Sequence, residues 1–511
     1  MLSPYIGLSD RVRHRKEYFG GILFHTGTGT LIDVDREAYA LILLLEKNGI
    51  VDANELDVIW YNTYGKRLDR SKAIRITEKL LALRILAVMP QGVLKKDCSL
   101  EHSNRYRIEW PSTQVLSAPE TLHWAVTFTC DANCPDCYVR RHKDKFAAEL
   151  ATKDALKVID KIADAGVFQL AIGGGEPFLR ADLAALVARA WERNLIVHLT
   201  TGQYQLESRV FNRIARYVKC LQFGVKADIL LEQPQKEREK LSRLIELSGG
   251  KGINIGANLI LSRSVIDKFE RIIELLSTTG FKQVTLLRYK PPGDINRWRK
   301  ESPDQDDLLA LERKLAKTVD TYSHIRFRVD CGLAFLQRNL PSQRAVHAGI
   351  RGCTAADRIL AMAPDGTLFP CSQLVGDELP AGNLLADDFT SIWTSSKILK
   401  RYRNFRQSKV LQDSHCGHCA ARNHCGGCRV FATDALGADP GCPAPLLSPP
   451  EHQKYVNKMD DIIWDIQESI GYTEGGAPYA TFEQIKGWLE EEDNYGYPKW
   501  LIKNNKRGDL D

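Results

Sequence analysis

The chain has 511 residues, of which 44% are hydrophobic and 26% charged, and its formal net charge is +6 at pH 7. This length predicts roughly three domains, each with its own core, and the composition is that of an ordinary globular protein. No apolar run reaches the ~18 residues of a membrane span, the first twenty residues lack the apolar stretch of a secretory signal, and the small positive charge does not indicate a nucleic-acid partner. We therefore expect a cytoplasmic protein with no membrane or nucleic-acid partner.

The first hundred residues predict a small, separate module. The stretch GGILFHTGTGTLIDVD predicts two short strands around a Gly/Thr turn, and helical patterns follow at residues 36–49, 53–65 and 70–86. A β-like LAVMP closes the segment. This order predicts a winged-helix-like domain over residues 1–98, followed by a linker over residues 99–118.

Alternating strands and helices begin at about Thr121. Helical patterns such as residues 153–166 and 182–194 separate six short apolar stretches. The six strand candidates are residues 123–128, 168–172, 195–200, 221–225, 253–261 and 283–288. They predict an α/β domain over residues 119–335, with a parallel sheet that is open or closed into a partial (β/α)6 barrel like that of a TIM barrel. Chemistry in such folds is expected at the C-terminal ends of the strands.

Three cysteines, Cys130, Cys134 and Cys137, lie within eight residues directly after the first predicted strand. An odd total of thirteen cysteines in tight spacings favours metal binding over disulfides. Structural zinc requires four ligands, whereas three thiolates suit a cubane cluster whose fourth iron stays open to a small molecule. Two alternatives remain: a zinc site completed by His123 or His142, and an inert group of cysteines.

The spacing C-x3-C-x2-C after a first strand resembles the signature of radical S-adenosylmethionine (SAM) enzymes. The stretch LAIGGGEPFLR, at the end of the second predicted strand, matches that family's Gly-Gly-Glu-Pro element with Gly174, Gly175, Glu176 and Pro177. The resemblance implies one [4Fe–4S] cluster on the three cysteines and SAM on its open iron. It also implies reductive cleavage of SAM to a 5'-deoxyadenosyl radical, which abstracts hydrogen from an unactivated carbon.

Further SAM contacts are implied by the resemblance alone. Thr200 ends the third predicted strand, Asp228 lies near the family's ribose-binding position, and Arg288 could pair with the ligand carboxylate. Asp136 stands where the family commonly has an aromatic residue or histidine, so adenine stacking falls to Tyr138 or is absent. The third-strand element also lacks the family's Asn before Gly. Each contact residue equally fits a solvated loop position.

Seven cysteines in the loop-rich residues 353–442 resemble the SPASM domain, expected over residues 336–450, which carries auxiliary iron–sulfur clusters. One departure is the two residues between Cys425 and Cys428, where the commonest form has three. The resemblance implies two auxiliary clusters of the [4Fe–4S] type. The first would use Cys416, Cys419, Cys425 and Cys442, and the second Cys353, Cys371 and Cys428, with Cys331 as its fourth ligand or an open position for substrate. The paired C-x2-C motifs by themselves also fit a zinc ribbon. Cys98 and Cys220 have no partner spacing.

The N-terminal module resembles the RiPP recognition element of enzymes that mature ribosomally made peptides. There a leader peptide adds a strand to the sheet edge and packs on the third helix, here residues 30–35 and 72–83. A structural cap and a DNA-binding module are the alternatives, although the third helix carries few basic residues.

Together these resemblances predict a radical SAM/SPASM enzyme that crosslinks a ribosomally synthesised precursor peptide, or excises part of one of its residues. A flavodoxin- or ferredoxin-like protein would donate the electron. The alternatives are a maturase of a protein side chain or of a cofactor, and an iron–sulfur regulator that binds DNA. The sequence identifies no catalytic acid or base, and it predicts a helical tail of unassigned role over residues 451–511.

Overall fold

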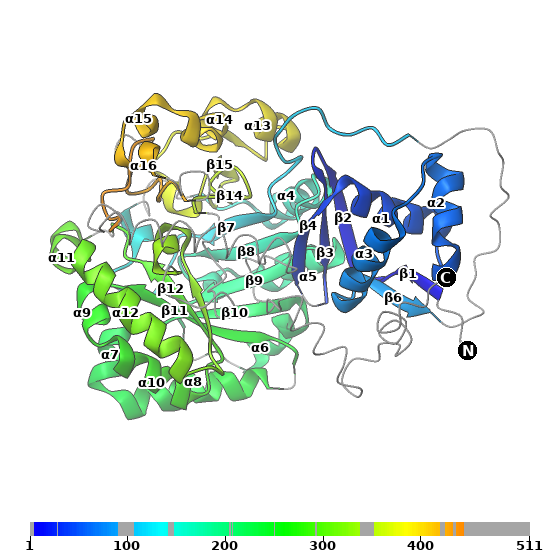
Figure 1. The fold of residues 1–511 in the computed structure, drawn as a ribbon. Coiled ribbons are helices and arrows are strands. Elements are labelled where there is room, and N and C mark those ends of the chain that lie inside the picture. The colour runs from blue at the N-terminus through cyan, green and yellow to red at the C-terminus, as the bar shows by residue number, and fades with distance from the viewer. Residues whose placement is uncertain are drawn as a thin grey trace. The chain divides into compact units, whose positions relative to one another are not determined.

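The computed structural model describes residues 5–27, 29–89, 107–141, 148–203, 206, 208–249, 251–291, 294–337, 352–419, 425–432 and 436–443. These residues fall into two compact units that divide between Leu116 and Ser117 (Figure 1). The predicted tail, Cys98 and His142 lie outside the described residues. No helix of the described part is long and apolar enough to cross a membrane.

The N-terminal unit consists of two small antiparallel sheets and three helices. Its strands are β1 (Tyr5–Leu8), β2 (Val12–Glu17), β3 (Gly20–His25), β4 (Thr30–Asp35), β5 (Val51–Asp52) and β6 (Leu86–Met89), and its helices are α1 (Arg36–Asn48), α2 (Leu56–Tyr64) and α3 (Arg70–Ala82). One sheet has the order β2-β3-β4 and the other β5-β1-β6. The predicted strand pair, the closing strand β6 and the three helices are present, and β1, β2 and β5 are additional.

Local signals explain where the helices of this unit begin and end. Asp35 ends β4 and caps α1, because its carboxylate accepts a hydrogen bond from the backbone N–H of Ala38 at 2.8 Å. Helix α3 ends at Ala82, before the predicted end at residue 86. The chain reverses there because Arg84 adopts a left-handed φ of 60° and leads into β6.

Part of the predicted linker belongs to the core of the N-terminal unit. Ile108 and Trp110 pack against its buried cluster, and the Trp110 ring lies edge-on to Tyr39, with centroids 6.1 Å apart. The guanidinium of Arg36 lies over the Trp110 ring at 5.3 Å. This unit therefore includes residues up to Leu116, well beyond the expected end at residue 98.

The second unit is built on one ten-stranded sheet. Its strands are β7 (Thr121–Thr127), β8 (Gln169–Gly174), β9 (Ile196–Thr201), β10 (Val218–Gly224), β11 (Asn254–Leu261), β12 (Gln283–Arg288), β13 (Arg326–Val329), β14 (Ile359–Met362), β15 (Thr367–Phe369) and β16 (Gly382–Asn383). The order is β13-β12-β11-β10-β9-β8-β7-β14-β15-β16. Strands β7 to β13 are parallel and follow the chain, so the six predicted strands lie side by side as the partial barrel requires.

The sheet extends beyond the six predicted strands at both edges. β13 adds to β12, and β14 pairs in parallel with β7, with Ile359 opposite Thr121. Strands β14 to β16 come from the cysteine-rich region, which was expected to be mostly loop. The cysteine-rich region and the barrel are therefore joined by backbone hydrogen bonds (Figure 1).

The second unit contains helices that pack on the sheet and, in its cysteine-rich region, four short helices from residue 389 on. In chain order they are α4 (Thr152–Asp164), α5 (Leu183–Glu192), α6 (Ser208–Ile214), α7 (Ala227–Glu232), α8 (Pro234–Ser248), α9 (Arg263–Asp267), α10 (Phe269–Thr279), α11 (Ile295–Glu301), α12 (Gln305–Thr321), α13 (Phe389–Ser395), α14 (Lys397–Arg403), α15 (Lys409–Gln412) and α16 (His415–His418). α4 is typical, because it buries a stripe at helical spacing. The stripe is Ala155, Val158, Ile159, Ile162 and Ala163.

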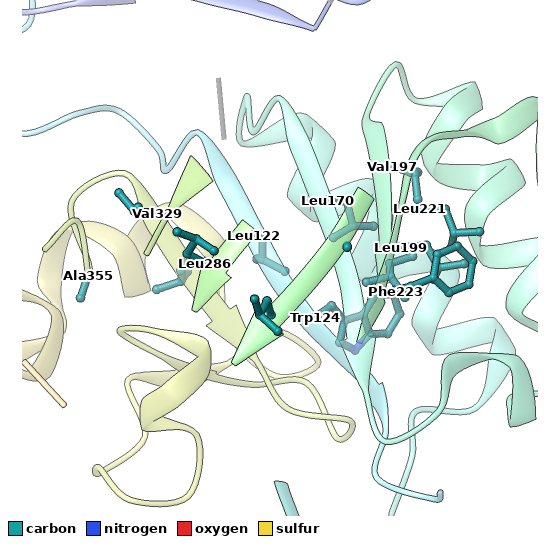
Figure 2. Close-up of a cluster of buried hydrophobic side chains, with 14 of the residues drawn as sticks. Leu122, Trp124, Leu170, Val197, Leu199, Leu221, Phe223, Leu286, Val329 and Ala355 are labelled. Carbon is teal, nitrogen blue, oxygen red and sulfur yellow. The ribbon is translucent and has the colours of Figure 1, made fainter. Parts of the chain in front are cut away.

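The core of the second unit lies where strand side chains meet these helices. Alternate strand residues such as Leu170, Leu199 and Phe223 are buried in one cluster (Figure 2). Because side chains alternate along a strand, the intervening residues face the opposite side of the sheet, which is the concave side in a barrel. One face of the sheet therefore packs against the helices, and the concave face is where the functional side chains are expected.

Candidate cofactor site

The three-cysteine loop follows β7 directly, as predicted from the sequence. Within it the backbone N–H of Cys137 donates to the carbonyl of Cys134 at 3.3 Å. Burial raises the pKa of the Cys137 thiol, and the neighbouring Cys134 and Cys130 raise that pKa further. Close, partly buried thiols stay ionised only beside positive charge, which iron would supply. The donor set thus fits an iron–sulfur cluster.

The Gly-Gly-Glu-Pro turn packs directly on this loop. The backbone N–H of Gly175 donates to the Thr127 carbonyl at 2.7 Å, and that of Glu176 donates to the Thr129 carbonyl at 2.9 Å. A Cβ on Gly174 would lie 2.2 Å from the Thr127 oxygen, and one on Gly175 would lie 2.3 Å from the Thr129 oxygen. Only glycine allows this approach of the two backbones, so the turn and the cysteine loop form one unit.

Glu176 is buried, with 2% of its surface exposed. Its carboxylate accepts hydrogen bonds from the Thr201 hydroxyl at 2.9 Å and from the backbone N–H groups of Gly202 and Phe178 at 3.0 and 3.1 Å. Burial raises the pKa of this carboxyl above its usual value. An ionised carboxylate offers about four acceptor positions, which leaves capacity for a ligand donor. The next residue, Pro177, is buried at the start of a short 3-10 turn.

Sequence reasoning missed Thr201. Thr200 is the residue named from the sequence, and it is exposed on the face opposite the buried Leu199. Thr201 lies on the other face and orients Glu176. The available signal was a second threonine directly after the expected strand end. The sequence could not tell which face of the sheet its hydroxyl takes, because that depends on the strand's register.

An ion-pair network joins the cysteine loop to two other strand ends. The Asp136 carboxylate accepts hydrogen bonds from the Tyr289 hydroxyl at 2.6 Å and from Nε and Nη2 of Arg297 at 2.8 and 3.2 Å. Nη2 of Arg297 also donates to Asp228 at 2.9 Å. The network thus joins Asp228, expected near the ribose, to the residue before the third cysteine.

Tyr138 lies in a small apolar cluster that includes Phe128, Phe369 and Val375. Burial raises the pKa of its phenol to about 12. The ring therefore packs toward the β14–β15 side of the cysteine loop. This placement gives no support to its assignment to the adenine.

Arg288 has a different partner from the one expected. Its guanidinium is buried, and Nη2 donates to Oδ1 of Asp439 at 2.9 Å while Nη1 donates to Oδ2. The Phe431 ring lies over the same guanidinium at 3.8 Å. Because both terminal nitrogens of this guanidinium already bond the Asp439 carboxylate, the structure does not support a salt bridge from Arg288 to a SAM carboxylate.

Cys331 lies near Cys353 and Cys428, and Cys371 lies near Cys353. Cys353 and Cys428 are buried, whereas Cys331 and Cys371 are partly exposed. Burial raises the pKa of Cys331 well above its usual value, and Asp330, Cys353 and Cys428 raise it further. Cys371 likewise has its pKa raised by burial, to about 11, with Cys353 among its neighbours. A Cβ on Gly332 would lie 3.0 Å from the Cβ of Cys428, so glycine permits the approach of the two loops.

A buried ion pair accompanies these four thiols. Nζ of Lys290 donates to Oδ2 of Asp330 at 2.7 Å. Burial alone would lower the pKa of Lys290, but Asp330 and the nearby cysteines, Cys428 first among them, raise it above its usual value. The site thus provides a fixed cation for an anionic cluster.

A second cysteine group lies around α16. Cys416 lies near both Cys419 and Cys425. Burial raises the pKa of the Cys416 and Cys425 thiols. Asp439 is near both and lies three residues before Cys442. Cys416, Cys419 and Cys425 therefore lie near one another, and the division of the cysteines between two clusters stays a prediction.

Cys220, which has no partner spacing in the sequence, is a core thiol. It is buried in β10, where burial raises the pKa of its thiol to about 11. Within the described ranges, no three His, Cys, Asp or Glu side chains converge as ligands of a single metal ion.

Comparisons with known proteins agree with this geometry. Residues 124–294 match the family model of the radical SAM superfamily, and residues 353–420 match that of an iron–sulfur cluster-binding domain, SPASM. A PqqA peptide cyclase of Granulibacter bethesdensis is 26% identical over 377 residues, which are 69% of this chain and 94% of the relative. The mycofactocin maturase MftC of Mycobacterium tuberculosis is 25% identical over 340 residues, 64% of this chain and 83% of the relative.

A solved structure shares the fold. The crystal structure of Streptococcus suis SuiB bound to its precursor peptide SuiA is 17% identical, with a TM-score of 0.58, and the match covers 83% of this chain and 96% of that one. The Gly-Gly-Glu-Pro turn on the cysteine loop and both family matches agree. This chain therefore contains a radical SAM domain over residues 124–294 and a SPASM iron–sulfur cluster-binding domain over residues 353–420.

Proposed function

We propose that this enzyme cleaves SAM reductively and uses the resulting 5'-deoxyadenosyl radical to modify a ribosomally synthesised precursor peptide. The observation that carries the proposal is the packing of the Gly-Gly-Glu-Pro turn on the cysteine loop, through the bonds of Gly175 and Glu176. The similarity to a peptide cyclase, a mycofactocin maturase and a peptide-bound SuiB supports a peptide substrate.

In this proposal Cys130, Cys134 and Cys137 hold a [4Fe–4S] cluster, which when bound supplies the electron that cleaves SAM. Glu176 accepts a hydrogen bond from the SAM amino group, because it is buried and already oriented by Thr201. Thr200 lines the concave face beside Gly173, where a Cβ would lie 3.9 Å from the Thr200 Cβ.

The auxiliary clusters are proposed on the two groups of thiols. Cys331, Cys353, Cys371 and Cys428 hold one, and Cys416, Cys419, Cys425 and Cys442 hold the other. Cys331 is included because its thiol shares the buried neighbourhood of Cys353 and Cys428. A flavodoxin- or ferredoxin-like donor in the cytoplasm supplies the electrons.

The leader of the precursor peptide is proposed to bind the N-terminal unit. β4 is an end strand of the described sheet β2-β3-β4, which is the position where an added strand would pair. Helix α3 follows in the same unit, as in the predicted docking site.

The decisive experiment replaces Cys130, Cys134 and Cys137 together by alanine. The variant should form no 5'-deoxyadenosine, while it keeps the iron of the auxiliary clusters. The measurement is chromatography of the nucleoside products, with iron determined per chain. Undiminished 5'-deoxyadenosine formation by this variant would refute the assignment.

A further inference from the structure

Arg297 is the centre of the network that joins three strand ends of the barrel. Its guanidinium contacts Asp136, which precedes the third cysteine of the loop after β7, and Asp228, which lies in α7 after β10. Tyr289, directly after β12, donates to the same Asp136 carboxylate. No motif of the sequence singles out Arg297.

The backbone of Arg297 is itself held in place. It lies in the first turn of α11, where the side chain of Asp294 accepts hydrogen bonds from the backbone N–H groups of Asn296 and Arg297 at 3.1 and 3.0 Å. The guanidinium is about one-third exposed, with 31% of its side-chain surface accessible. A capped helix thus presents a rigid, planar guanidinium to two carboxylates, one in the cysteine loop and one in α7.

The charges of the network explain what the fork does. The carboxylates of Asp136 and Asp228 would repel each other, and the guanidinium between them makes their approach favourable. The hydrogen bonds that Arg297 donates to Asp136 hold the pKa of Arg297 above its usual value although burial lowers it, while burial and Asp136 both raise the pKa of the Tyr289 phenol. Both groups therefore remain donors at neutral pH.

The position of Asp136 adds an effect on the proposed cluster. Asp136 is covalently adjacent to Cys137, so its negative charge lies beside the cluster that those cysteines would hold. A nearby negative charge disfavours the gain of an electron, and a paired cation offsets this. Arg297 therefore partly neutralises the carboxylate at the place where reduction must occur.

We infer that Arg297 is a positioning residue for SAM: it fixes Asp228 at the nucleoside end of the site relative to the cysteine loop, and it neutralises Asp136 beside the cluster. This inference rests on the proposed function. It assigns two measurable consequences to one side chain, SAM affinity through the geometry of Asp228 and the reduction potential of the cluster through the charge of Asp136.

The test compares Arg297→Gln with Arg189→Gln in the reconstituted full chain. Arg189 is a matched control, because its Nε and Nη2 bond Asp160 at 2.9 Å, its Nη1 contacts Glu192, and its side chain is 35% exposed on the outer helices. SAM is titrated into the reduced protein while the electron paramagnetic resonance spectrum of the cluster is recorded. The midpoint potential is measured without SAM, and iron content verifies loading.

Arg297→Gln should bind SAM about tenfold more weakly and should have a lower midpoint potential than the unchanged chain, whereas Arg189→Gln should match the unchanged chain in both. Arg297→Lys keeps the charge but loses the fork, so it should restore the potential and not the affinity. Asp136→Asn should raise the potential. A merely structural role would not separate the two readouts in this way.

Unchanged affinity and potential in a fully loaded Arg297→Gln protein would overturn the inference. If that variant loads no iron, the double variant Asp136→Asn/Arg297→Gln, in which both charges are removed together, must load the cluster and return the potential toward that of the unchanged chain. Failure of the double variant also overturns the inference. If the unchanged chain itself shows no spectral response to SAM, the proposed function fails instead.

Discussion

Glu176 is a buried carboxylate that is also proposed to bind the amino group of SAM. Its carboxylate is buried, and three donors, from Thr201, Gly202 and Phe178, keep it oriented. The motif predicted the residue, but the sequence could not identify Thr201 as its partner. The sequence shows the alternation of apolar and polar residues along a strand. The face that each residue takes at the end of the strand depends on the register in which the strand pairs with its neighbours.

Replacing Glu176 by glutamine should separate stability from binding. Burial raises the pKa of Glu176 above about 4.5. The unfolded chain therefore releases this proton first, and the fold loses stability as the pH rises through the folded-state pKa. Glu176→Gln removes that loss, so its melting temperature relative to the unchanged chain should increase between pH 4.5 and neutral pH. Its SAM affinity should fall about tenfold, because a charge-assisted hydrogen bond is lost.

Melting curves over this pH range and SAM titrations of the same reconstituted samples measure both effects. Thr201→Val is a useful companion, because it removes the orienting hydroxyl and keeps the charge. A Glu176→Gln protein with the SAM affinity of the unchanged chain would contradict the proposed contact with the amino group.

At the scale of elements, the turn after β8 shows how backbone packing positions the chemistry. Gly174 has a φ of 118°, and Gly175 approaches the Thr129 carbonyl without a Cβ in the way. The motif was visible in the sequence, and so was its place at a strand end. Which backbone it contacts was not visible, because that depends on the parallel pairing of β7 with β8.

Gly175→Ala should impair the three-cysteine loop specifically. The added Cβ would lie 2.3 Å from the carbonyl oxygen of Thr129, a backbone atom that cannot move without displacing the loop. We expect loss of one cluster's iron and of SAM cleavage, with the auxiliary iron retained. Gly173→Ala is the control for iron loading, because its Cβ would meet only ordinary contact at 3.9 Å. Equal iron contents in the two variants would argue against this role of Gly175.

The pair between Arg288 and Asp439 joins β12 to the last described cysteine loop. Burial works to raise the pKa of Asp439, but Arg288 and the backbone N–H of Cys428 hold it below its usual value. Asp439→Asn leaves a buried guanidinium without its counter-charge, which typically costs about 3–5 kcal/mol. We expect a lower urea midpoint and loss of auxiliary iron.

The exposed pair of Arg271 and Glu274 provides the control for this prediction, and Glu274→Gln there should have little effect on either measurement. Full auxiliary iron in Asp439→Asn would show that the pair does not maintain the cysteine loop.

At the scale of the whole molecule, the sequence predicted the barrel strands better than the architecture around them. Strands β8 to β12 follow runs such as FQLAI and QVTLLR, whose apolar residues identify them directly. β14 and β15 were missed, because they are short and lie among glycines, prolines and cysteines that indicate loops. The pairing of β14 with β7 is a contact between residues more than 200 positions apart, which no local pattern encodes.

Removal of the N-terminal unit tests its proposed role in binding the leader peptide. The cut belongs after Leu116 and not near residue 98, because Ile108 and Trp110 pack into the core of that unit and would otherwise remain as exposed apolar side chains.

A chain beginning at Ser117 should still cleave SAM without peptide, since the described cysteines and the Gly-Gly-Glu-Pro turn all lie in the second unit. It should lose affinity for the precursor, because β4 and α3 are gone and the core peptide no longer reaches the barrel at high effective concentration. Fluorescence anisotropy of a labelled leader and the rate of 5'-deoxyadenosine formation measure the two effects. A parallel loss of both would indicate that the N-terminal unit supports the fold of the barrel, whereas loss of peptide binding alone indicates a docking module.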